Sequence, residues 1–253
     1  MSEKRVATLD ERFRALDPLG RLRLLRAEIQ GRIVFTTSFG LEDQFLTHLI
    51  FGNALDIDVV TLDTGRLFPQ TYALWSETET KYGRRIRAYY PERKAIEALV
   101  AEQGIDGFYA SVEARKACCG ARKVEPLKRA LQDASAWIAG LRADQSEHRS
   151  RAAFVSFDGG FGLLKANPLI DWSREQIVDA ASAAGVSINP LHAQGFPSIG
   201  CAPCTRAIAP DEDERAGRWW WEQDNKKECG LHVAPDGRIL RSPENDRERP
   251  WAG

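Results

Sequence analysis

The stretch Arg32-Ile-Val-Phe-Thr-Thr-Ser-Phe-Gly-Leu41 joins three structural signals in ten residues. Its β-branched and aromatic beginning predicts a buried strand, residues 37–40 predict a tight turn, and residues 41–51 predict a helix. The same order follows twice more, with strands at 57–62 and 85–89 and helices at 69–82 and 92–103. Such alternation predicts an α/β fold with a mostly parallel sheet, helices on both faces and ligands bound where the strands end.

The remaining sequence extends this pattern on both sides. Further strands are expected at 136–141, 152–157 and 162–165, and Asp158-Gly159-Gly160 predicts a hairpin that would add an antiparallel edge. Further helices are expected at 1–30 with a break at 18–20, at 117–131, at 173–184 with Ser173 as the cap, and at 211–222.

Length and composition indicate one globular domain. The chain has 253 residues, of which 43% are hydrophobic and 28% charged. It shows neither an apolar run of about 20 residues nor a secretory signal, so we expect a cytoplasmic protein without a membrane partner. Because 35 Lys and Arg offset 36 Asp and Glu, no nucleic-acid partner is expected. Residues 223–253 are rich in charge, Pro and Gly, which predicts a mobile C-terminal segment after a domain at 1–222.

Five cysteines fall into two pairs and a single residue: Cys118, Cys119, Cys201, Cys204 and Cys229. An odd number without a secretory signal argues against a disulfide framework. Four thiolates are soft ligands, which suit zinc or an iron–sulfur cluster. Adjacent cysteines reach two iron atoms of a cluster more readily than they share one zinc ion, so the spacing favours iron–sulfur. Zinc and unliganded buried thiols remain open alternatives.

Two loops follow predicted strands at the expected ligand-binding edge. Residues 36–40 lack the Walker and dinucleotide glycine motifs, but they lead into a helix N-terminus that suits phosphate or sulfate. A plain strand–helix connection is the simpler interpretation. In the loop Asp63-Thr64-Gly65-Arg66, the Asp would accept from ribose or adenine and the Arg would pair with phosphate. A helix cap and a surface Arg explain that loop equally well.

Basic residues near the C-terminus offer two further candidates. Arg215 and Arg218 would share one face of the helix expected at 211–222 and clamp an anion, although ion pairs four residues apart on an exposed face explain them as well. Cys229 lies between two lysines and His232, and these cations favour its nucleophilic thiolate form. A spare surface thiol is the alternative.

Six motifs in one order resemble those of the assimilatory sulfonucleotide reductases. The resemblance runs from about residue 30 to residue 232, and the two cysteine pairs make the chain similar to the cluster-bearing, adenylyl sulfate branch of that family. The motifs are Ser38-Phe-Gly40, Leu62-Asp-Thr-Gly-Arg-Leu-Phe-Pro-Gln-Thr-Tyr72, Cys118-Cys-Gly-Ala-Arg-Lys-Val-Glu-Pro-Leu127, Trp137-Ile-Ala-Gly-Leu-Arg142, Cys201-Ala-Pro-Cys204 and Glu228-Cys-Gly-Leu-His232.

The resemblance implies a fold, a cofactor and a set of site residues. The fold would be like that of the adenine-nucleotide alpha hydrolases, as in ATP pyrophosphatases, and domain 1–222 would bind both nucleotide and cluster. One [4Fe–4S] cluster per chain would be held by Cys118, Cys119, Cys201 and Cys204. Substrate would be bound by Ser38, Phe39, Gly40, Asp63, Thr64, Gly65, Arg66, Lys123, Arg142, Arg215, Arg218 and His232.

The resemblance also implies a reaction, the thioredoxin-dependent reduction of adenylyl sulfate to sulfite and AMP in sulfate assimilation toward cysteine. Cys229 would attack the sulfur and form an S-sulfocysteine, and thioredoxin would release sulfite through a transient mixed disulfide. Reduction of the 3′-phosphorylated nucleotide, alone or in addition, is the nearest alternative. A pyrophosphatase or ligase of this fold would need an S-G-G-x-D-S loop, which the sequence lacks. A non-catalytic metal-binding module is a further alternative, and a homo-oligomer is compatible with the sequence.

Overall fold

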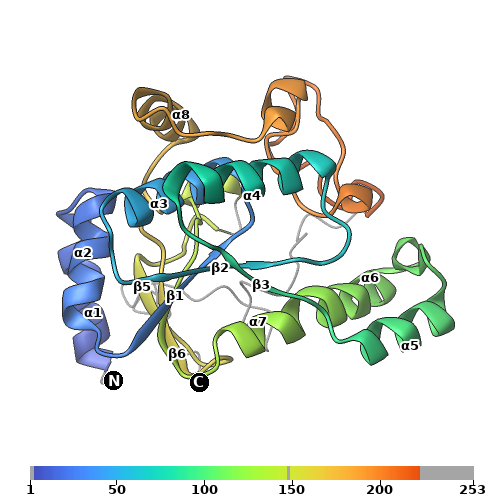
Figure 1. Cartoon of the computed structure of the whole chain (residues 1–253), viewed down its shortest axis with the longest axis horizontal. Coiled ribbons are helices and arrows are strands. Elements are labelled where there is room, and N and C mark those ends of the chain that lie inside the picture. Colours follow the sequence, from blue (N-terminus) through green and yellow to red (C-terminus); the bar gives the residue numbers. More distant parts are fainter. Residues whose placement is uncertain (1–2, 147–148, 223–253) are drawn as a thin grey trace, which may run out of the picture.

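A six-stranded sheet forms the centre of the protein (Figure 1). The computed structural model describes residues 3–146 and 149–222, so the expected C-terminal segment lies outside the described residues. The sheet order is β3-β2-β1-β4-β6-β5. The strands are β1 (Arg32–Thr37), β2 (Asp58–Leu62), β3 (Arg87–Tyr89), β4 (Ala134–Ile138), β5 (Val155–Asp158) and β6 (Leu163–Ala166).

The predicted mostly parallel sheet with an antiparallel edge is confirmed. All neighbouring strands pair in parallel except β5, which pairs antiparallel with β6. The turn between them is stabilised by Asp158, whose Oδ1 accepts from the backbone N–H groups of Gly160 and Phe161 at 3.0 and 3.2 Å. β1 lies between β2 and β4, and its Val34 and Phe35 are fully buried. The carboxyl ends of these three strands therefore meet at one edge of the sheet.

Helices cover both faces of the sheet. In the view of Figure 1, α3 and α4 lie on one side of it, while α5, α6 and α7 lie on the other. No described helix has the length and apolarity needed to cross a bilayer. The α-helices are α1 (Glu3–Arg14), α2 (Pro18–Glu28), α3 (Leu41–Gly52), α4 (Pro69–Tyr82), α5 (Arg93–Gln103), α6 (Val112–Cys119), α7 (Glu125–Ala130) and α8 (Arg174–Ala183).

The cysteine pair lies at the end of a helix, not near its start as expected. Ser111 caps α6 by accepting from the Ala114 N–H at 3.1 Å, so this helix begins earlier than 117. A single turn of π-helix, Gly120–Val124, then connects α6 to α7. Such turns carry one residue more than an α-helical turn and often occur at functional sites.

The prediction of a helix at 211–222 is wrong. This segment forms turns, and Arg218 makes an isolated antiparallel bridge with Thr205. The Arg206 N–H donates to the Gly217 carbonyl at 3.0 Å, and a Cβ on Gly217 would lie 2.3 Å from the Arg206 carbonyl oxygen. Trp219 has a left-handed backbone with φ of 43°. Pairing with a distant segment therefore overrides the local helical charge pattern.

Arg21 joins the N-terminal helices to the segment before α8. Its side chain is 2% exposed, and its Nε donates to the Phe13 carbonyl at 2.8 Å. Its Nη1 donates to the Pro168 carbonyl at 2.8 Å, and both Nη atoms contact the Asp171 carboxylate, at 2.5 and 2.8 Å. A buried guanidinium thus satisfies two carbonyls and one carboxylate from three segments.

Replacing Arg21 by Met should lower the free energy of unfolding by about 2 to 3 kcal/mol, because both carbonyls and the carboxylate lose their donor. Urea unfolding followed by circular dichroism measures this change. Arg23→Met is the control, since Arg23 is exposed and donates to the Asn53 side chain. An equal loss in both variants would contradict the role given to Arg21.

Candidate functional site

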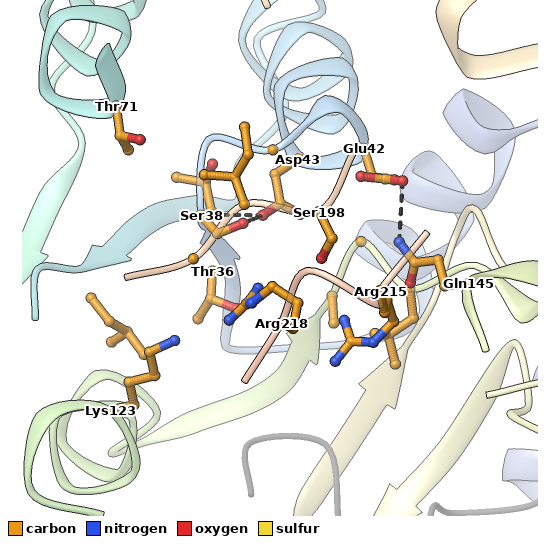
Figure 2. Close-up of a pocket in the computed structure, with 18 of the residues that line it drawn as sticks. Thr36, Ser38, Glu42, Asp43, Thr71, Lys123, Gln145, Ser198, Arg215 and Arg218 are labelled. Atoms are coloured by element: carbon orange, nitrogen blue, oxygen red, sulfur yellow. Dashed lines mark hydrogen bonds between the residues drawn. The ribbon is translucent and has the colours of Figure 1, made fainter. Parts of the chain in front are cut away.

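A pocket opens at the edge where the central strands end (Figure 2). Its walls come from the carboxyl ends of β1, β2 and β4, from the N-terminus of α3, and from segments 197–200 and 214–219. We call it the strand-end pocket. Its position is the one that the strand–loop–helix pattern predicts for a ligand site.

The loop before α3 is held in place by Asp43. The Asp43 Oδ2 accepts from both the backbone N–H and the hydroxyl of Ser38, each at 2.6 Å. Phe39 adopts a left-handed φ of 59° and buries its ring against Trp75, with centroids 5.6 Å apart. Burial raises the pKa of Asp43 to about 6, against the two bonds from Ser38. The loop is therefore fixed beside the first amides of α3, which favour an anion.

Basic side chains enter the strand-end pocket from several segments. Figure 2 shows Lys123 on one side, reaching from the π-helical turn, and Arg215 and Arg218 on the segment that crosses the pocket. Arg218 is 6% exposed, and its guanidinium lies 4.9 Å from the ring centroid of Trp219. Its Nε has no hydrogen-bond partner among the described residues. A buried donor of this kind suits an anionic ligand.

The structure gathers about half of the predicted substrate residues around the strand-end pocket. Its lining includes Ser38, Gly40, Thr64, Lys123, Arg215 and Arg218. The others that the structure describes do not line it. These are Phe39, Asp63, Gly65, Arg66 and Arg142. Cys229 and His232 lie outside the described residues, so their predicted roles stay predictions.

Three of the residues off the pocket have local structural contacts instead. Asp63 Oδ1 accepts from the Gly65 N–H at 2.8 Å and from the Tyr72 hydroxyl at 2.7 Å, which shapes the second loop. Arg66 points away toward Asp106, with Nη1 3.3 Å from its Oδ1, and stacks 5.0 Å from the ring centroid of Phe108. Of the four residues in the second loop, only Thr64 therefore lines the pocket.

Sequence reasoning missed several lining residues. Gln145 and Arg149 follow β4, and Arg149 is buried with its Nη1 2.6 Å from the Gln145 Oε1. Ser198 lies just before the second cysteine pair. The strand-end rule pointed to the first two, since β4 neighbours β1 and its following loop must open on the same edge.

All four expected cluster cysteines surround a second, smaller cavity, which we call the thiol cavity. Cys118 and Cys119 reach it from the end of α6, and Cys201 and Cys204 from the chain after residue 200. Phe108 and Trp219 complete its apolar wall. The two cavities are neighbours, because Lys123, Arg218 and Trp219 line both of them. In addition, Thr64 of the strand-end pocket hydrogen-bonds to Cys201 of the thiol cavity.

The donor set of the thiol cavity fits an iron–sulfur cluster. Among residues 3–146 and 149–222, no group of three or more His, Cys, Asp or Glu side chains is arranged to hold a metal ion, so the fit rests on the number and softness of the sulfurs. Four sulfurs around a cavity suit a larger, multinuclear group. Five cations line the same cavity and would balance an anionic cluster with thiolate ligands. They are Arg66, Arg115, Arg122, Lys123 and Arg218.

The thiols of the cavity differ in their surroundings. Burial raises the pKa of Cys204 to about 11 and also raises that of Cys118. Burial acts in the same direction on Cys201, but Lys123, the Thr64 hydroxyl 3.2 Å away and nearby arginines outweigh it, so the pKa of Cys201 is lowered. Two of the cations that act on Cys201, Lys123 and Arg218, also line the strand-end pocket.

A buried ion pair joins the thiol cavity to the end of the described chain. The Arg115 Nε and Nη2 donate to the two carboxylate oxygens of Glu222 at 2.8 and 2.9 Å, and both side chains are buried. Arg115 belongs to α6, the helix that carries the first cysteine pair. Glu222, the last described residue, is therefore fixed to the helix that carries the first cysteine pair.

Comparison with known proteins agrees with this arrangement. Residues 32–207 match the family model described as the phosphoadenosine phosphosulfate reductase domain. The chain is 56% identical over 232 residues to an adenosine 5′-phosphosulfate reductase of Sinorhizobium fredii (strain USDA 257), which covers 92% of each chain.

Solved structures agree on the fold. A phosphoadenylyl-sulfate reductase from Candida auris, in a phosphate complex, has a TM-score of 0.70 at 24% identity and covers 82% of this chain and 98% of its own. Yeast FAD synthetase with FAD has a TM-score of 0.51 at 14% identity and covers 80% and 74%. The expected adenine-nucleotide hydrolase-like fold is confirmed, and with more than half its length matched by the family model, the chain belongs to the phosphoadenosine phosphosulfate reductase domain family.

Proposed function

We propose that the chain reduces adenylyl sulfate to sulfite and AMP with electrons from thioredoxin, in the assimilation of sulfate. The observation that carries this proposal is the shared wall of the two cavities, where Lys123 and Arg218 line both the strand-end pocket and the four-thiol cavity. The relatives named adenosine 5′-phosphosulfate reductase support the same substrate.

The strand-end pocket would hold the nucleotide by its anionic group. The first amides of α3 offer backbone donors, and Lys123, Arg215 and Arg218 offer positive charge. Charge develops on the phosphate when its bond to sulfur breaks, so these cations would favour the transition state over the bound substrate.

The reaction balances in three steps. The Cys229 thiolate attacks the sulfur of adenylyl sulfate, an S–S bond forms, the S–O bond to the phosphate breaks, and AMP leaves with the electron pair. One thioredoxin thiolate then attacks the Cys229 sulfur and sulfite leaves. The second thioredoxin thiol resolves the mixed disulfide, which restores the Cys229 thiol and leaves thioredoxin oxidised.

Cys118, Cys119, Cys201 and Cys204 would hold a [4Fe–4S] cluster, which when bound supplies an electrostatic field next to the strand-end pocket. In this scheme both electrons come from thioredoxin. Lys123 and Arg218 would then serve both sites, since each lines both cavities.

The nucleophile is tested by intact-protein mass after anaerobic incubation with adenylyl sulfate. We expect wild type to gain one SO₃ and to lose it with reduced thioredoxin, while Cys229→Ser gains nothing. Incubation with the 3′-phosphorylated nucleotide tests the alternative substrate. If protein that retains its iron forms no adduct with either nucleotide, the proposed reaction is wrong.

The cofactor is tested by elemental analysis of anaerobically purified protein. We expect about four iron and four sulfide per chain. Cys201→Ser should lose most of both, because one of four thiolate ligands is removed. Cys229→Ser is the matched control and should keep the full content. One zinc per chain without sulfide would contradict the cluster.

A further inference from the structure

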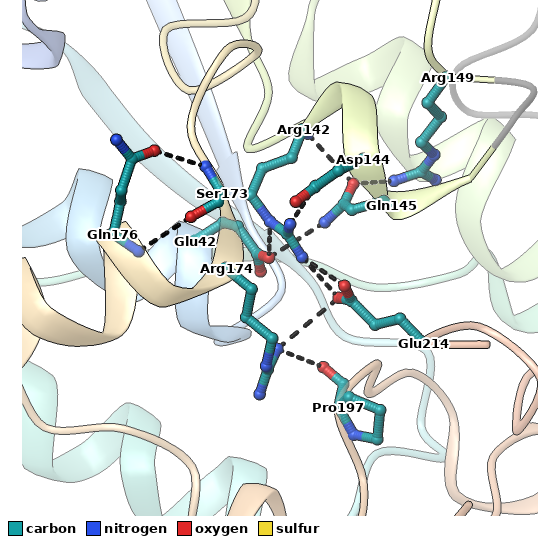
Figure 3. A network of polar contacts seen from close by, with 10 residues as sticks. All are labelled: Glu42, Arg142, Asp144, Gln145, Arg149, Ser173, Arg174, Gln176, Pro197 and Glu214. Carbon is teal, nitrogen blue, oxygen red and sulfur yellow. Dashed lines mark hydrogen bonds and ion pairs between the residues drawn. The ribbon is translucent and has the colours of Figure 1, made fainter. Parts of the chain in front are cut away.

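Arg142 is the centre of a buried ionic network beside the strand-end pocket (Figure 3). Its side chain is 0% exposed. Its Nε donates to Glu42 Oε1 at 2.7 Å, and its Nη2 donates to the two oxygens of Glu214 at 2.7 and 2.6 Å. Its Nη1 donates to Asp144. All three guanidinium nitrogens therefore already have a carboxylate partner.

Two of these carboxylates belong to the wall of an anion-binding pocket. Glu42 lies in the first turn of α3, and Glu214 directly precedes Arg215; both line the strand-end pocket. Arg142 itself does not line it. Left without a counter-ion, two carboxylates at this place would repel the phosphate and sulfate groups of the nucleotide.

One further cation, Arg174, pairs with Glu214 at a longer distance. Arg174 Nη1 lies 3.6 Å from Glu214 Oε1, beyond hydrogen-bond distance, and also donates to the Pro197 carbonyl at 3.3 Å. The Gln145 amide donates to Glu42 at 3.1 Å but carries no charge. Burial raises the pKa of Glu214, an effect that Arg142 opposes. Arg142 is thus the cation that both carboxylates share at hydrogen-bond distance.

We propose that Arg142 is a positioning residue that neutralises Glu42 and Glu214, and that it does not contact the nucleotide. This proposal rests on the proposed function, because it requires an anionic ligand in the strand-end pocket. It differs from the substrate-binding role that the sequence resemblance implies for Arg142.

The test is the affinity of cluster-loaded protein for AMP and for adenylyl sulfate, measured anaerobically by titration calorimetry. Arg142→Met should weaken both by about tenfold or more at low salt, because a carboxylate at the pocket wall loses its counter-ion. Rising salt should reduce the defect, since screening weakens repulsion in the open pocket. Adding Glu214→Gln to Arg142→Met should restore part of the affinity, because it removes one of the two carboxylates that are left without a counter-ion.

A direct contact between Arg142 and nucleotide predicts the opposite result. The double variant would then bind as weakly as Arg142→Met, and that outcome would overturn the proposal. Arg21→Met is the matched control, because Arg21 is also a buried, ion-paired arginine but its carboxylate partner Asp171 does not line the pocket. It should lose stability and keep its affinity for AMP.

A fallback variant and the AMP titration separate a failure of this proposal from a failure to fold and from a failure of the proposed function. If Arg142→Met does not fold, Arg142→Gln with and without Glu214→Gln makes the same comparison, because glutamine removes the charge but keeps a hydrogen-bond donor for the carboxylates. The AMP titration is independent of chemistry at Cys229. Wild type that binds AMP but forms no sulfur adduct would overturn the proposed function alone, whereas an unrescued double variant would overturn the role of Arg142.

Discussion

The meeting of several negative groups at one sheet edge is the constraint on which this site depends. The strand-end pocket would receive an anionic nucleotide, the thiol cavity beside it gathers four cysteines, and Glu42, Asp43 and Glu214 also line the pocket. Like charges at such distances repel strongly when they are buried. Lys123 and Arg218 lie between the two cavities, and Arg142 lies behind the carboxylates. The fold thus supplies cations at the wall between the two cavities and beside Glu42 and Glu214.

The backbone around Cys119 shows how the two cavities come to share their cations. The π-helical turn Gly120–Val124 follows this cysteine, and it directs Arg122 and Lys123 toward the thiol cavity. Arg122 Nη1 donates to the Thr64 carbonyl at 2.8 Å, so the turn is also fixed to the loop after β2. Arg115 fixes the other side through Glu222. The cysteine helix is therefore tied both to the nucleotide edge and to the chain that leads to Cys229.

Local pattern predicted the parts of the fold that local physics determines. The alternation of β-branched strands with helices gave the parallel sheet, and Asp158-Gly159-Gly160 gave its antiparallel edge. Pattern failed at 211–222, where the bridge between Thr205 and Arg218 is a contact across the chain. The motif around Arg142 placed this residue at the correct strand end, but its orientation depends on Glu42 and Glu214, which come from distant segments. Spacing along the sequence carries no information on which side of the wall a guanidinium lies.

The most direct test of the account is a crystal structure of the anaerobic protein with AMP, with anomalous scattering measured at the iron absorption edge. We expect iron only between Cys118, Cys119, Cys201 and Cys204, and the AMP phosphate in the strand-end pocket next to Lys123 and Arg218. Iron at another place, or AMP bound away from these two cations, would contradict the claim that the cavities form one site.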